Sequence, residues 1–169
     1  SDIFASLGAW SPIQTSEEGP WSLSARCSSS KCASDGETGA AEAHKVLFRT
    51  VERRDVDLLL GFLLDGLSSQ SRELFAPYPY SESRESLKTA VLSAIDDSQS
   101  RKSLSFVGIQ DLNGKCVVVA HGFLWAAQEE IPELGLAVAD RLHGRGLGRT
   151  LMAVLLRAAC MLGSLALEP

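Results

Sequence analysis

The sequence lacks the features of a membrane protein and of a basic nucleic-acid-binding protein. No apolar run free of charge and glycine approaches the roughly 18 residues that suggest a membrane-spanning helix. Lys and Arg number 16 against 21 Asp and Glu, and the net charge of −5 argues against nucleic-acid binding through bulk positive charge. We therefore expect neither a membrane nor a nucleic acid as a partner.

Cysteine is also scarce, and its four positions favour neither a disulfide framework nor a zinc site. Cys116 and Cys160 lie in apolar runs, which predicts buried thiols. Cys27 and Cys32 lie close together, but no second cysteine pair and no histidine cluster accompanies them. We predict no metal site and a reducing, cytoplasmic location. The chain opens without a basic segment that leads into an apolar one, so we expect no secretory leader.

The 169 residues suffice for one domain, preceded by a segment of different composition. Residues 1–44 are rich in Ser, Gly, Ala and Glu and show no sustained helical or strand periodicity. Trp10 and Trp21 are exceptions that could dock on the domain or on a partner. We expect residues 1–44 to form a flexible or partly ordered N-terminal arm and residues 45–169 to form the folded domain.

Residues 45–169 alternate between strand and helix patterns. We expect strands at 45–51, 103–110, 116–126, 133–139 and 164–168, and helices near 55–64, 71–75, 83–95 and 147–162. The pair Asn113-Gly114 predicts a tight hairpin. A helix separates the last two strands, so these should run parallel and close a right-handed crossover. The prediction is a mixed α/β sheet of order β-α-α-β-β-β-α-β.

The stretch 133–150 combines a buried strand, a glycine-dense loop and the start of an apolar helix. Glycines at 144, 146 and 148 let backbone N–H groups converge without obstruction by a Cβ atom. The first N–H groups of the helix lack intrahelical partners and form the positive end of its dipole. We expect the amides from Arg145 to Thr150 to bind a phosphate, with charge added by Arg145 and Arg149. A plain tight turn is the alternative.

Two common phosphate loops do not fit this stretch. A nucleotide-binding P-loop needs Gly-Lys-Ser/Thr, but Arg149 follows Gly148, and His143 occupies the place of the first glycine. A dinucleotide fingerprint that begins at Gly144 would require glycine at position 149. Both nucleotide-binding classes are therefore disfavoured.

The segment 143–148, His-Gly-Arg-Gly-Leu-Gly, resembles the acyl-CoA pyrophosphate loop of the GNAT superfamily N-acetyltransferases. That pattern is Gln/Arg-x-x-Gly-x-Gly/Ala, and only the first position differs. Val138 precedes His143 by the offset seen in the family, and the expected order of elements matches. Segments 48–55 and 67–75 resemble the opening of bacterial members related to protein lysine acetyltransferases. The resemblance covers residues 45–168 and does not extend to 1–44.

The resemblance implies an N-acetyltransferase that moves an acetyl group from acetyl-CoA to a small-molecule or peptide amine by direct attack. Glu133 is the candidate general base, with Glu130 as a weaker alternative, and the Val138 N–H is a candidate oxyanion donor. The residues it assigns to cofactor binding are Leu136, Ala137 and Val138 beside the pantetheine arm, and His143, Gly144, Arg145, Gly146, Leu147, Gly148, Arg149 and Thr150 at the pyrophosphate.

Two departures from the family keep alternatives open. His143 replaces the usual Gln or Arg, and the chain stops at Pro169, where the family continues with a helix and two strands. We expect a C-terminally incomplete fold. Either the sequence is a truncated piece of a longer chain, or a partner chain or the N-terminal arm supplies the missing strands, and a homodimer is possible. The alternative functions are a noncatalytic CoA-binding or regulatory module and an assembly protein with an empty loop. His121 is expected to be structural, and Tyr78 and Tyr80 fit packing or an acceptor pocket equally well.

Overall fold

A computed structural model describes residues 24–28, 45–125 and 132–161. The strand expected at 164–168 lies outside this described part, as do Glu130, Trp10 and Trp21. No helix among the described residues is long and apolar enough to cross a membrane.

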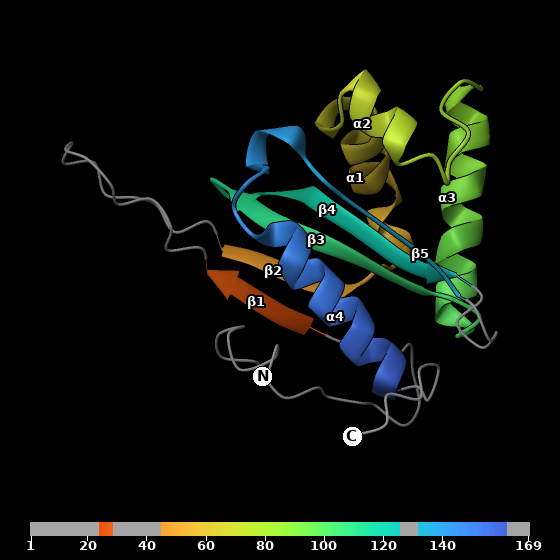
Figure 1. Cartoon of the computed structure of the whole chain (residues 1–169). Coiled ribbons are helices and arrows are strands. Elements are labelled where there is room, and N and C mark those ends of the chain that lie inside the picture. The colour runs from red at the N-terminus through yellow and green to blue at the C-terminus, as the bar shows by residue number, and fades with distance from the viewer. Residues whose placement is uncertain (1–23, 29–44, 126–131, 162–169) are drawn as a thin grey trace.

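Five strands form one antiparallel sheet in the order of the chain (Figure 1). They are β1 (Ser24–Ser28), β2 (Lys45–Thr50), β3 (Leu104–Leu112), β4 (Lys115–Trp125) and β5 (Glu133–Val138). The four strands expected between 45 and 139 are confirmed. Asn113 and Gly114 form the predicted hairpin with positive φ angles of 56° and 82°. β1 was not predicted, because Ser-Ala-Arg-Cys-Ser is short and has only two small apolar residues, which is a weak strand signal. Its pairing with β2 supplies the strand instead.

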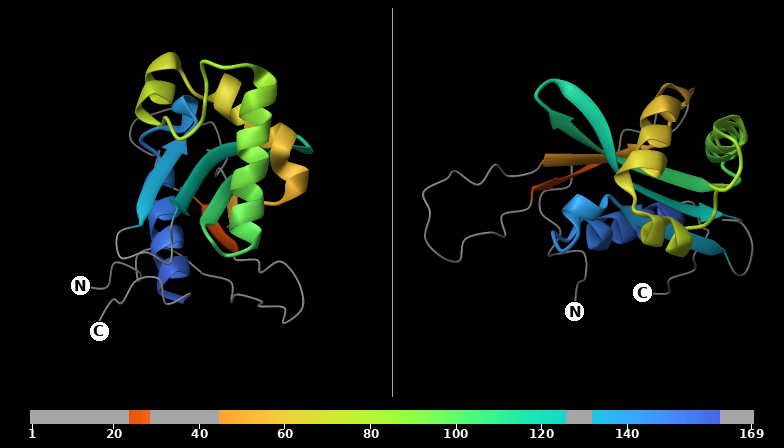
Figure 2. Two further views of the ribbon diagram at one scale, coloured as in Figure 1. Left: turned by 90° about the vertical axis from the view of Figure 1, so that its right-hand side faces the viewer. Right: turned by 90° about the horizontal axis from the view of Figure 1, so that it is seen from above.

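Helices cover both faces of the sheet. They are α1 (Val56–Gly61), which continues into a π-helical turn η2 (Phe62–Gly66), α2 (Ser69–Leu74), α3 (Arg84–Gln99) and α4 (Leu147–Met161), with short 3₁₀ turns η1 (Arg53–Asp55) and η3 (Asp140–Leu142). Helix α4 lies on one face, and α1 and α3 lie on the other (Figure 2). The hydroxyls of Ser68 and Ser83 cap α2 and α3 by accepting the N–H groups of Ser71 and Ser86.

Two glycines bring the layers close together and identify the faces of the central strands. A Cβ atom at Gly122 on β4 would lie 2.9 Å from Leu155 and 3.0 Å from Leu151, so this position faces α4. At Gly135 on β5 the ring of Phe123 occupies the space that a Cβ would need. Because side chains alternate along a strand, the odd-numbered residues from 121 to 125 and from 133 to 137 share the face opposite α4.

The prediction of a buried thiol was wrong for Cys116, which is exposed. It lies in the hairpin half of β4, whose first residues are solvent-exposed, while the second half of the strand is covered by helices. Cys160 on α4 is only partly buried. The apolar run around Cys116 therefore did not show which of its residues lie at the exposed end of the hairpin and which lie in the core.

A buried ion pair fixes the connection from β2 to α1. Asp55 is 1% exposed and accepts two hydrogen bonds of 2.7 Å from the guanidinium of Arg49. The same carboxylate accepts the backbone N–H of Glu52 at 2.8 Å. These bonds satisfy a charge that would otherwise be costly to bury, and they anchor the start of α1 to the sheet.

Replacement of Asp55 by Ala should lower the free energy of unfolding by about 3–5 kcal/mol, because it leaves the Arg49 guanidinium without its buried partner. Asp96→Ala is the matched control, since it removes an ion pair with Arg53 in which both side chains are well exposed. That change should cost less than about 1 kcal/mol. Urea denaturation measures both values, and equal losses would contradict the buried role of Asp55.

Candidate active site

The loop between η3 and α4 has an open surface built by two glycines. Gly144 and Gly146 have φ angles of 75° and 80°, in the left-handed region that glycine adopts without strain. Nothing lies within 4 Å of the position that a Cβ would take at either residue. The backbone here is therefore accessible to a ligand.

Helix α4 begins immediately after Gly146. The Gly146 carbonyl accepts the N–H of Thr150 at 3.0 Å and its hydroxyl at 3.2 Å, which makes the Thr150 N–H the first intrahelical donor. The N–H groups of Leu147, Gly148 and Arg149 then have no intrahelical acceptor and can bind an anion. The N–H of Thr150, one of the predicted phosphate contacts, donates within the helix, and the assignment of Thr150 to phosphate binding stays a prediction. The Leu147 side chain is buried and holds the first turn of α4 against the core.

His143 joins this loop to the end of β5. Its Nε2 lies 2.8 Å from the carbonyl oxygen of Val138. A carbonyl only accepts, so Nε2 carries the proton, and Nδ1 is the bare nitrogen of the neutral ring. The imidazolium form also donates from Nε2, so the bond does not depend on the protonation state.

Asp140 connects the same loop to α2. Its carboxylate accepts the N–H of Ser68 at 3.0 Å and the hydroxyl of Ser71 at 2.7 Å, and it lies 3.7 Å from His143 Nε2. The hydrogen bonds from Ser68 and Ser71, with the nearby imidazole, lower the pKa of Asp140 below its ordinary value. Nothing in the sequence indicated that Asp140 has a role in this site, because its partners Ser68 and Ser71 are about 70 positions away.

A cavity of about 230 Å³ lies between β5 and α2. The predicted cofactor residues Leu136, Ala137, Val138 and His143 line it together with Ser71, Phe75 and neighbouring leucines. The N–H of Ala139 donates to Val119 on β4. By alternation the peptide groups of residues 136 and 138 point away from β4, toward the outer edge of the described sheet. The structure therefore brings the predicted strand contacts and His143 together.

Glu133 lies apart from this cavity. It is exposed at the start of β5, five residues before Val138, which is roughly 17 Å along an extended strand. Its register partner on β4 is Trp125, on the sheet face opposite α4. The structure thus places the candidate base at the other end of β5 from the glycine loop.

An aromatic cluster separates these two ends of β5. The rings of Phe123 and Trp125 stack with centroids 4.2 Å apart, and Phe75 lies 5.8 Å from Phe123 and 5.9 Å from His121. Trp125 had no predicted role. The signal available in the sequence was the spacing of His121, Phe123 and Trp125 at every second position of one strand.

Tyr78 and His121 form a buried polar pair inside the cluster. Nδ1 of His121 lies 2.9 Å from the carbonyl oxygen of Phe106, so Nδ1 carries the proton, and Nε2 accepts the Tyr78 hydroxyl at 2.8 Å. Burial lowers the pKa of His121 to about 4 and raises the pKa of Tyr78, so both groups are neutral near pH 7. Burial also raises the pKa of Tyr80 to about 12, and its hydroxyl has no partner among the described residues.

His121 makes the stability of the fold depend on pH. Between pH 6.5 and about 4 the unfolded chain binds a proton at this residue that the folded chain does not bind. The free energy of unfolding should therefore fall as the pH is lowered across this window, by about 3 kcal/mol over the full shift. Denaturant unfolding at several pH values measures the slope.

His121→Gln should remove this part of the slope, because a neutral amide replaces the imidazole. A slope that persists in His121→Gln would contradict the assignment.

Comparisons with known proteins place the fold. No protein-family model matches the sequence, and no curated protein does. Among solved structures, the ribosomal-protein α-N-acetyltransferase RimL is similar with a TM-score of 0.56 at 12% identity, over 93% of this chain and 73% of that chain. RimL in complex with coenzyme A gives 0.56 at 15% identity, over 71% and 66%.

An acetyltransferase of the GNAT family from Streptococcus pneumoniae has a TM-score of 0.50 at 20% identity, over 71% of this chain and 70% of that chain. These likenesses agree with the order of helices and strands in the described residues. The chain therefore has the fold of the GNAT N-acetyltransferases, as the sequence predicted.

Proposed function

We propose that this protein is an N-acetyltransferase that moves an acetyl group from acetyl-CoA to a primary amine. The observation that carries the proposal is the arrangement of the glycine loop and β5. Three N–H groups at the start of α4 follow directly on the open loop of Gly144 and Gly146, and His143 connects that loop to the end of β5. The fold neighbour RimL, whose structure includes coenzyme A, supports the assignment.

The residues of the loop fit a pyrophosphate. Gly144 and Gly146 leave space above the backbone, and the exposed Arg145 and Arg149 add positive charge at the N-terminus of α4. The outward N–H and carbonyl of Leu136 suit the amides of a pantetheine arm, as an added strand would, while the Val138 carbonyl is bonded to His143 and only the Val138 N–H stays open. When bound, acetyl-CoA supplies an acetyl group activated as a thioester.

The proposed transfer needs an acceptor amine without its extra proton. Glu133 is exposed and is the candidate to accept that proton. Because it lies roughly 17 Å along β5 from Val138, the proton reaches it through a chain of water molecules. The amine nitrogen then forms a bond to the acetyl carbon while the bond to sulfur breaks, and the second amine proton is released to the thiolate or to solvent. The Val138 N–H, at the outer edge of β5, is available to the developing negative oxygen.

The acceptor class rests on the chemistry of the site rather than on a named substrate. A small-molecule or peptide amine fits an exposed carboxylate in a protein of net charge −5. RimL acts on a ribosomal protein by its name, which supports a peptide amine. A cytoplasmic location and a homodimer belong to the same proposal.

A noncatalytic CoA-binding module is the second candidate function. The separation of Glu133 from the cavity beside β5 favours it, because a base must come within hydrogen-bond reach of the amine or of one bridging water. The two candidates share the cofactor and differ in turnover.

Glu133→Gln should lower kcat for amine acetylation by about 100-fold, because the amide cannot accept the proton. The affinity for CoA should not change, since Glu133 lies at the other end of β5 from the loop. Release of free thiol from acetyl-CoA with a panel of amines measures kcat, and calorimetry measures the affinity. CoA binding without thiol release by the unchanged protein would support the noncatalytic module instead.

Gly146→Ala should weaken CoA binding by about tenfold or more, since it displaces backbone donors and hydrogen bonds to charged groups contribute roughly 1.5–3 kcal/mol. Gly114→Ala is the matched control. Its φ of 82° is as unfavourable for alanine, its surroundings are as open, and it lies in the hairpin away from the loop. Both variants should lose similar stability by thermal unfolding. Equal CoA affinity in the two variants would contradict a cofactor role for the loop.

A further inference from the structure

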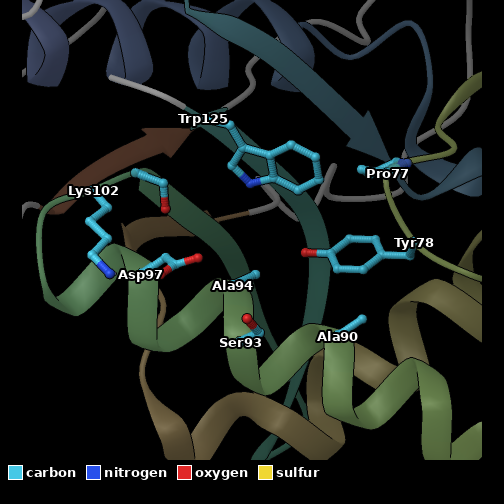
Figure 3. A pocket seen from close by; sticks show the side chains of 9 residues that line it. Pro77, Tyr78, Ala90, Ser93, Ala94, Asp97, Lys102 and Trp125 are labelled. Carbon is cyan, nitrogen blue, oxygen red and sulfur yellow. Dashed lines mark ion pairs between the residues drawn. The ribbon is translucent and has the colours of Figure 1, made fainter. Parts of the chain in front are cut away.

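A second pocket, of about 520 Å³, lies between α3 and the end of β4 (Figure 3). Its walls combine apolar and polar side chains, and Ser93, Ser103, Asp97 and Lys102 supply the polar part. Trp125, Tyr78 and Pro77 supply two aromatic rings and a pyrrolidine ring, and Ala90 and Ala94 of α3 form the opposite side. The volume falls within the roughly 300–1,000 Å³ of small-ligand pockets, and small residues on α3 leave room for a large apolar group.

One end of this pocket carries two opposite charges. The Asp97 carboxylate and the Lys102 ammonium lie 3.9 Å apart, and their side chains are 49% and 75% exposed. An exposed pair at this distance contributes little stability, so it can open toward a ligand. Lys102 would repel a ligand that carries only a positive charge, and Asp97 would repel one that carries only a negative charge. A peptide group suits both, because its N–H donates to the carboxylate and its carbonyl accepts from the ammonium.

The pocket and the candidate base Glu133 share one neighbour, Trp125. Trp125 is the direct register partner of Glu133, and residues paired in this way have their Cβ atoms about 4.5–5.5 Å apart on the same sheet face. Trp125 therefore has Glu133 as a neighbour on β5 and also lines the pocket. If the amine of an acceptor lies at Glu133, a neighbouring side chain of that acceptor can pass the indole ring of Trp125 and enter the pocket.

We propose that this pocket selects the acceptor, and that the acceptor is a peptide with an aromatic or large aliphatic side chain in its first two residues. The side chain enters between Trp125 and α3, and the following peptide group meets Asp97 and Lys102. This inference rests on the proposed acetyltransferase function, and it adds the substrate class.

The test compares acetylation of the peptide amides Ala-X-Ala and X-Ala-Ala, where X is Phe, Leu, Ala or Lys. Phe and Leu should exceed Ala and Lys by about tenfold or more in kcat/KM in one of the two series, mainly through KM. Ser93→Phe should abolish this preference, because Ser93 is exposed on α3 and lines the pocket, so that a phenyl group there fills it.

Thr89→Phe is the matched control. Thr89 is also exposed on α3 and is not part of the pocket lining, so the preference should persist. Thermal unfolding of the two variants should agree, which shows that a loss of preference in Ser93→Phe does not come from unfolding. A preference that persists in Ser93→Phe, or equal use of all peptides by the unchanged protein, would overturn the proposal.

A binding measurement separates this inference from the proposed function. N-acetylated Ala-Phe-Ala-amide has no free amine, so its binding, followed by NMR titration, does not depend on turnover. Binding that Ser93→Phe removes would support the pocket even if no amine is acetylated. Acetylation of peptides without any such binding would overturn the pocket and leave the proposed function in place.

Discussion

The bond from His143 Nε2 to the Val138 carbonyl fixes where the N-terminus of α4 lies relative to β5. Together with the backbone bonds from Leu142 to Ala139 and from His143 to Asp140, it sets the distance between the open amides of the loop and the outward peptide groups of β5. Asp140 extends the same constraint to α2 through Ser68 and Ser71. The cavity beside β5 exists because these three segments are held together, and the cofactor half of the proposed site depends on it.

The aromatic cluster on the opposite sheet face gives the acceptor half of the site its walls. His121 is neutral and satisfied at both nitrogens, so Tyr78 is held in place and its ring lines the second pocket. Phe123 covers Gly135 and stacks on Trp125, which connects the middle of β5 to the pocket beside Glu133. In this proposal the cofactor lies at the Val138 end of β5 and the acceptor lies at the Glu133 end, and the acetyl group is transferred between the two.

Sequence patterns predicted those features of the fold that depend on residues close together in the chain. Alternation located the strands from β2 to β5, Asn113-Gly114 located the hairpin, and the glycines with the apolar helix located the loop at 143–148. Contacts distant in sequence were not predictable in this way. Asp140 with Ser68, and Tyr78 with His121, join segments separated by more than 40 positions. Burial also depends on which end of a strand the helices cover, which is why Cys116 was wrongly expected inside.

The most direct test of the central claim is an NMR titration of the backbone amides with CoA. If the loop holds the pyrophosphate, the largest shifts should occur at Leu147, Gly148 and Arg149, because their N–H groups have no acceptor within α4. The amides of the hairpin at Asn113 and Gly114 should not move. Saturation with CoA that leaves the amides of residues 147–149 unshifted would contradict the claim.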